Sequence, residues 1–158
     1  MKPICGKKLQ DYWLMIKLPV VASFALILLN QYNIWALDRS NPTLDLLINL
    51  AGFFLPIYVG WNCVKSFECD LKQSAVAGGI FGLAGVLFGA AAALVMMLLG
   101  YNIFNRAIAA ARTAGSPLTY DAVLLIAIFS FIGAIILTPI FTALIALLGA
   151  FAAQKMNK

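Results

Sequence analysis

The sequence predicts an all-α fold: a polytopic integral membrane bundle of four helices. Of the 158 residues, 63% are hydrophobic and only 11% are charged, whereas about 25% are charged in an average soluble domain. A small fold cannot hide this much apolar surface in one core, because its surface is large relative to its volume. Four long apolar segments divide the chain. Helices are the expected spanning structure, since lipid cannot satisfy backbone polar groups.

The first two apolar segments cover residues 18–37 and 45–64, after a basic head at residues 1–17. Between the two segments, Asn41-Pro42 is typical of a turn. Pro56 lies inside the second segment. Proline removes a backbone hydrogen bond, so we expect a kink near this position.

The third and fourth segments, residues 74–99 and 122–153, contain no charged residue. The fourth exceeds the ~20 residues that one span needs but falls short of the ~40 needed for two. We therefore expect one long helix, tilted or kinked at Pro139, with a re-entrant hairpin near Pro139 as the alternative. Residues 100–121 form the predicted outer loop. Within this loop, residues 105–114 either extend the third helix or form a separate interfacial helix.

Basic residues are divided unequally between the two sides that four spans would create. One side carries only Arg39, Arg106 and Arg112. The other side carries the remaining eight basic residues, which are Lys2, Lys7, Lys8, Lys17, Lys65, Lys72, Lys155 and Lys158. An excess of Lys and Arg marks the cytoplasmic side. We therefore expect a cell-membrane protein whose N- and C-termini are both cytoplasmic.

Small residues line one face of the third segment and one face of the fourth. The third carries four glycines at intervals of four, three and four residues: Gly78, Gly82, Gly85 and Gly89. The face on the fourth consists of Thr142, Ala146, Gly149, Ala150 and Ala153. Glycine is costly inside a helix, but small residues at this spacing let two membrane helices approach closely. We expect the two faces to pack antiparallel within one chain; a seam between subunits or a gating surface is the alternative.

Polar residues cluster near the outer ends of the first two segments: Asn30, Asn33, Asp45 and Asn49. Their spacings of three and four residues place each pair on one helix face. The expected structure is a hydrogen-bonded patch between helices, with helix capping at the interface. The alternative is an outward-facing vestibule that binds a cation or a polar solute. No ionisable residue lies at mid-membrane, which disfavours proton-coupled transport.

Catalytic chemistry finds little support in the sequence. The chain has no histidine, so the commonest general base and metal ligand is missing. No catalytic motif is present, and we expect no catalytic residue, metal or cofactor. The three cysteines, Cys5, Cys63 and Cys69, lie near the reducing face and are expected as free thiols. Cys63 and Cys69 are either a redox or acylation site or, as we expect, inert small apolar residues.

The predicted function is non-enzymatic. We expect a small multi-pass membrane protein of structural, accessory or assembly type that acts through helix packing. Its expected partners are the lipid bilayer and either further copies of itself in a homo-oligomer or another membrane protein. Nucleic acid is not expected, because the basic residues are scattered singly. The alternative is a small transporter or channel, whose permeation path a chain this short would most easily form as an oligomer, with a polar cavity lined by Asn30, Asn33 and Asn49. A membrane enzyme comes third. No motif is specific enough to indicate a family.

Overall fold

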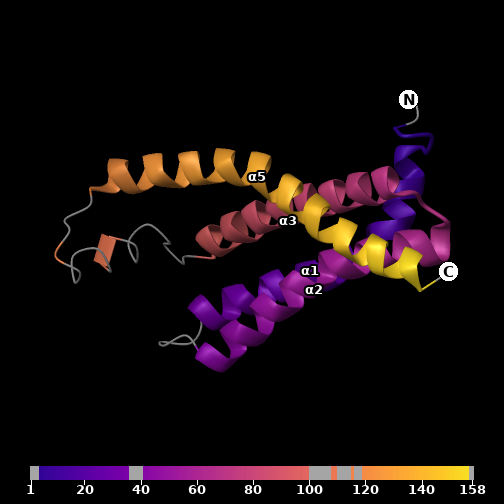
Figure 1. Cartoon of the computed structure of the whole chain (residues 1–158). Helices are drawn as coiled ribbons and strands as arrows, with labels where there is room; N and C mark the ends of the chain where they lie inside the picture. The colour runs from indigo at the N-terminus through magenta and orange to yellow at the C-terminus, as the bar shows by residue number, and fades with distance from the viewer. Residues whose placement is uncertain (1–3, 36–40, 100–107, 110–114, 116–118, 157–158) are drawn as a thin grey trace.

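The protein is helical throughout the part of the chain that its computed structural model describes, apart from turns and one isolated β-bridge (Figure 1). The described residues are 4–35, 41–99, 108–109, 115 and 119–156, and the side chains of residues 32–35 are excluded. The helices are α1 (Leu9–Trp35), α2 (Pro42–Phe67), α3 (Leu71–Leu98) and α5 (Tyr120–Lys155). All four are long and apolar enough to cross a membrane. The all-helical class is thus confirmed, while most of the predicted loop 100–121, including nearly all of residues 105–114, lies outside the described residues.

Helix α1 begins at Leu9 and therefore includes about half of the predicted basic head, residues 1–17. The Asp11 carboxylate accepts a hydrogen bond of 2.8 Å from the Lys8 backbone N–H at this end. Tyr12 and Ile16 are fully buried in the first turns. Packing of these side chains extends the helix beyond the apolar segment, because burial stabilises a turn that hydropathy alone does not mark.

Helix α2 starts and ends with well-defined caps. The Asn41 side chain accepts hydrogen bonds from the backbone N–H groups of Thr43 and Leu44, at 3.0 and 3.3 Å. This is a favoured N-cap arrangement. At the other end Glu68 adopts a left-handed conformation with φ of 51°. Left-handed residues commonly close a helix C-terminus, so the chain turns at once into α3.

Helix α3 begins with a capping box. The Asp70 carboxylate accepts the Gln73 backbone N–H at 2.7 Å, and the Gln73 side chain accepts the Asp70 N–H at 3.1 Å. This reciprocal pair satisfies two backbone donors that a helix N-terminus otherwise leaves free. The short α2–α3 turn is therefore held on both sides by local hydrogen bonds.

Helix α5 is one continuous helix, although the sequence also allowed a hairpin near Pro139. In Figure 1 the helix changes direction about midway along its length. Pro139 lies inside it, and the Thr142 hydroxyl donates to the backbone carbonyl of Thr138 at 2.8 Å. Proline lacks the backbone N–H that a helix needs, and a threonine hydroxyl bonded to the carbonyl one turn earlier competes with the helix hydrogen bonds. Both features favour helix bending.

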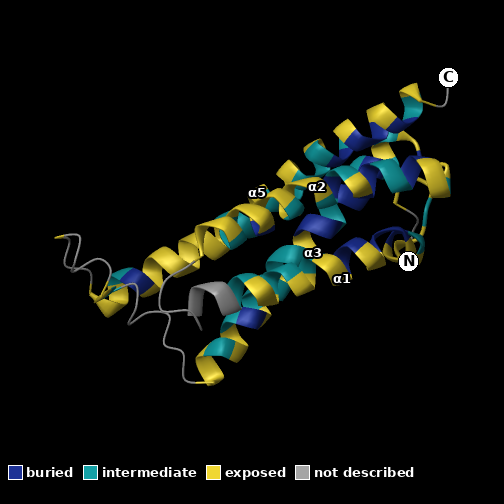
Figure 2. Ribbon diagram, turned by 90° about the horizontal axis from the view of Figure 1, so that it is seen from below, coloured by how far each residue is buried: buried dark blue, intermediate teal, exposed yellow. Residues whose placement is uncertain are grey.

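The four helices converge at the end of the molecule where both termini lie and spread apart at the other end (Figures 1 and 2). The most extensive contacts join α5 to α3 and to α2, whereas α1 packs on α2 and α3. The main buried cluster consists of Tyr12, Met15, Ile16, Val20, Val59, Cys63, Cys69, Ala77 and Phe81. By contrast, residues 124–132 of α5 are all exposed. The molecule thus has a closed end near the termini and an open end, and these two names are used below.

Candidate helix-packing surfaces, polar groove and sulfur cluster

The first half of the α3 glycine face lies directly against α5. A Cβ placed on Gly78 would lie 2.5 Å from the Ala146 Cβ and 2.7 Å from the Thr142 carbonyl oxygen. A Cβ on Gly82 would overlap the Thr142 hydroxyl. Any larger residue at these positions would force the two antiparallel helices apart.

The second half of that glycine face has no comparable neighbour. A Cβ on Gly85 would lie 4.0 Å from the Ser23 hydroxyl of α1, and one on Gly89 would have no described atom within 4 Å. The predicted set Gly78, Gly82, Gly85 and Gly89 is therefore divided between the closed and open ends. The face is continuous in sequence, but only half of it packs against α5.

The second part of the α5 face packs on α2, which differs from the expected pairing with α3 alone. A Cβ on Gly149 would overlap the Ile57 carbonyl, and a Cβ on Gly60 would overlap the Ala146 carbonyl. Ala150 and Ala153 are fully buried and cluster with Val64 of α2 and its neighbours. Gly60 is the residue that sequence reasoning missed, because a lone glycine forms no repeating pattern.

The predicted polar residues are only partly brought together. Asn30 and Asn49 line an open groove of about 280 Å³ between α1 and α2, together with Ser23 and Gly52. Asp45 is not among its lining residues and lies in the first turn of α2. The side chain of the fourth predicted residue, Asn33, lies outside the described residues. The groove has polar amides but no ionisable group among its described lining residues.

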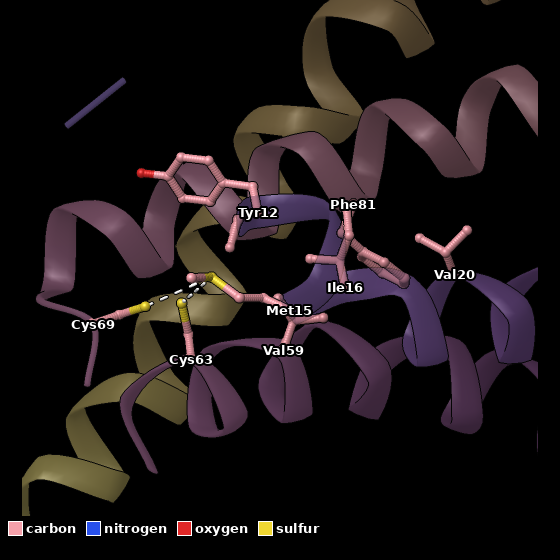
Figure 3. Packing of buried hydrophobic residues seen from close by; sticks show 9 residues of the cluster. Tyr12, Met15, Ile16, Val20, Val59, Cys63, Cys69 and Phe81 are labelled. Carbon is pink, nitrogen blue, oxygen red and sulfur yellow. Dashed lines mark hydrogen bonds between the residues drawn. The ribbon is translucent and has the colours of Figure 1, made fainter. Parts of the chain in front are cut away.

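Three buried sulfur atoms meet at the closed end, each from a different part of the chain (Figure 3). The thiol of Cys63, near the end of α2, donates to the Met15 thioether of α1 at 3.5 Å. The thiol of Cys69, in the α2–α3 turn, lies 3.7 Å from the same thioether. Figure 3 shows both thiols pointing toward Met15. The three residues are called the sulfur cluster below.

The N-terminal turn is tied to the helices around this cluster. The Tyr12 hydroxyl donates to the Ile4 carbonyl at 3.0 Å, and the Gln73 side chain donates to the Cys5 carbonyl at 2.9 Å.

Hydrogen bonding with Cys63 and burial raise the pKa of the Cys69 thiol well above its ordinary value. Cys69 is therefore a neutral thiol at pH 7.

Comparison with protein-family models, with curated proteins and with solved structures finds no match to this chain. The class of the protein therefore rests on its own features. Four helices that are long and apolar enough to cross a membrane indicate a multi-pass membrane protein.

Proposed function

We propose that this chain is a non-enzymatic, multi-pass protein of the cell membrane that acts through helix–helix contacts with a second copy of itself. All four helices cross the bilayer in this proposal, and both termini lie in the cytoplasm. The orientation is supported by lysines at the closed end, where Lys7, Lys65, Lys72 and Lys155 lie near helix termini. Basic residues concentrate on the cytoplasmic side of membrane proteins.

The observation that carries the proposal is an apolar groove at the open end, between α3 and α5. It measures about 400 Å³, and small or apolar side chains line it. The lining residues are Ala90, Ala93, Leu94, Met97, Leu124, Ala127, Ile128 and Phe131. Alanines on both helices leave room for a third helix to approach closely, which is how small residues promote association in membranes.

The glycine contacts also support packing within the chain at the closed end and packing between chains at the open end. Gly60 and Gly78 at the closed end meet backbone atoms of α5, whereas Gly89 and Gly133 meet no described atom within 4 Å. Glycine costs roughly 0.5–1 kcal/mol relative to alanine inside a helix. Packing within the chain compensates for that cost at the closed end only. A second copy seated at the open end would compensate for it there.

The test is the oligomeric mass of the purified protein in nanodiscs over a range of protein-to-lipid ratios. We expect the wild type to be a dimer or larger oligomer. Ala93→Leu combined with Ala127→Leu fills the groove from both walls and should give a monomer with unchanged helical content. Gly52→Leu on α2 is the matched control and should leave the oligomer intact.

Two outcomes would contradict self-association through this groove. One is a wild type that stays monomeric at every ratio, which would mean that lipid fills the groove. The other is a double variant that remains oligomeric, which would place the contact elsewhere. A variant that loses its helical signal has to be replaced by the milder Ala93→Val, whose mass then decides the question.

A second candidate function, a small transporter or channel, is favoured by the polar groove between α1 and α2. Its lining runs from Asn30 to Ser23, which is about 10 Å along α1 at 1.5 Å per residue. We would measure flux of small cations and polar solutes into proteoliposomes. This function requires flux that Asn30→Leu and Asn49→Leu abolish and that Asn62→Leu, at the closed end, does not. If the flux does not exceed that of protein-free liposomes, the transport function is excluded.

A further inference from the structure

We propose that the sulfur cluster of Met15, Cys63 and Cys69 is a binding site for a soft monovalent metal ion, with Cu(I) as the biological example. Three side chains from three separate parts of the chain converge on one point, and all are at least 95% buried. This inference does not depend on the helix-packing function or on membrane orientation, since it rests on the closed end alone.

The spacing of the sulfur atoms suits a three-coordinate site. Ligands placed about 2.3 Å from a metal, a typical metal–thiolate distance, lie about 4.0 Å apart when arranged in a trigonal plane. The two thiols lie 3.5 and 3.7 Å from the Met15 thioether. Both thiol–thioether distances are within about 0.5 Å of that spacing, a difference that the flexible methionine side chain can take up.

The donor types decide which metal the cluster would select. Thiolate and thioether sulfur are soft ligands that favour Cu(I) over Mg²⁺ or Ca²⁺. Structural zinc requires four ligands, most often Cys and His. Among the described residues no three His, Cys, Asp or Glu side chains come together, so this cluster depends on its methionine. A thiol pair with only a redox role would need no thioether.

Binding has a simple proton balance. One Cu(I) ion would displace the two thiol protons and bond to two thiolates and one neutral thioether, which leaves the site with one negative charge. Lys7 donates to the Phe67 carbonyl at 3.2 Å, which holds its ammonium group beside the α2–α3 turn. Its positive charge would offset the charge of the metal–thiolate group.

The cluster is also within reach of the molecular surface. Cys69 lies in the α2–α3 turn, between two membrane-spanning segments rather than inside one. The N-terminal turn, in which Ile4 pairs with Lys7, lies over this end of α1 and is held there by the hydrogen bond from the Tyr12 hydroxyl to the Ile4 carbonyl. A metal ion can therefore enter by displacement of a short turn, without separation of the helices.

The experiment is a competition between the reduced, purified protein and a coloured Cu(I) chelator under anaerobic conditions. We expect about one Cu(I) per chain, bound with the sulfur-only coordination that soft ligands favour and detected by X-ray absorption. Cys63→Ser and Cys69→Ser should abolish retention. Met15→Leu keeps the side-chain volume and should weaken binding more than about tenfold, at least the loss that an outer-shell partner typically causes.

Two matched variants control for unspecific thiol and thioether effects. Cys5→Ser removes the exposed thiol, and Met97→Leu repeats the methionine change at the open end; both should bind like the wild type. Uptake that stays below one ion per chain in the folded wild type would overturn the proposal. So would equal loss in Cys5→Ser, preference for Zn²⁺, or a Cys63–Cys69 disulfide as the only chemistry that the cluster supports.

Discussion

Individual glycines determine how closely the helices approach. Gly60 and Gly149 lie on opposite sides of the α2–α5 contact, and each faces a backbone carbonyl of the other helix. The carbonyl lies so close to each glycine Cα that even a methyl group would overlap it. The contact therefore gains dispersion energy from backbone atoms that larger residues would keep apart.

Gly60→Ala should destabilise the protein by about 1–3 kcal/mol, because its methyl group would overlap the Ala146 carbonyl and overpack the contact. The matched control is Gly52→Ala in the same helix, where a Cβ meets no described atom within 4 Å. That variant should be neutral or up to about 1 kcal/mol more stable, since alanine is the better helix former. Thermal unfolding in detergent, followed by circular dichroism, measures both. Equal effects of the two changes would contradict the contact.

Some of these positions can be predicted from sequence and others cannot. The repeat that contains Gly78 and Gly82 is visible because periodic glycines are rare without a packing reason. Gly60 forms no repeat, so its role appears only when α5 is placed against it. Met15 and Cys63 lie 48 positions apart in the sequence, and no local spacing connects them.

The α2–α3 turn brings several local devices together. Glu68 closes α2 in a left-handed conformation, and the Cys69 N–H donates to the Cys63 carbonyl at 3.0 Å. Asp70 then caps α3. The turn thereby fixes the position of Cys69 relative to Cys63, so the geometry of the sulfur cluster depends on it.

Glu68→Gly should stabilise the protein by about 0.5–1 kcal/mol, because glycine adopts the left-handed conformation without the cost that other residues carry. Glu68→Ala is the control: it also removes the carboxylate but keeps the Cβ, and we expect little change. Unfolding midpoints in detergent compare the three proteins. A gain of equal size in both variants would assign the effect to charge instead of backbone conformation.

Helix ends were harder to predict than helix identity. Hydropathy located all four apolar segments, because no other residue pattern yields such long uncharged stretches. It placed the start of the first segment at residue 18, whereas α1 starts at Leu9. Buried Tyr12 and Met15 account for the difference, since tertiary packing stabilises turns that carry charged residues. Helix α5 continues through Pro139, as expected for an apolar segment that is too short for two spans.

The arrangement of the four helices sets the two ends of the molecule apart. At the closed end, small residues bring α2, α3 and α5 together and the sulfur cluster is enclosed. At the open end, residues 124–132 of α5 are exposed and a wide apolar groove separates it from α3. Packing within the chain is thus concentrated near the termini, which leaves the opposite half for contacts with lipid or with another copy.

Sequence alone indicated the four long apolar helices of the described residues and their antiparallel order, because lengths of apolar segments and short connections limit the possibilities. It did not indicate that the helices spread apart at one end. That feature depends on which small residues find a partner. Gly78 and Gly89 belong to one repeat yet have different surroundings.

The proposed topology has four spans with the closed end in the cytoplasm, and Cys5 offers a native probe of it. Cys5 is exposed, whereas Cys63 and Cys69 are buried. We would treat intact spheroplasts and inverted membrane vesicles with a membrane-impermeant maleimide, using Cys5→Ser as the background control. This topology predicts labelling of Cys5 in inverted vesicles and none in intact spheroplasts. Labelling in intact spheroplasts, or equal labelling in both, would contradict it.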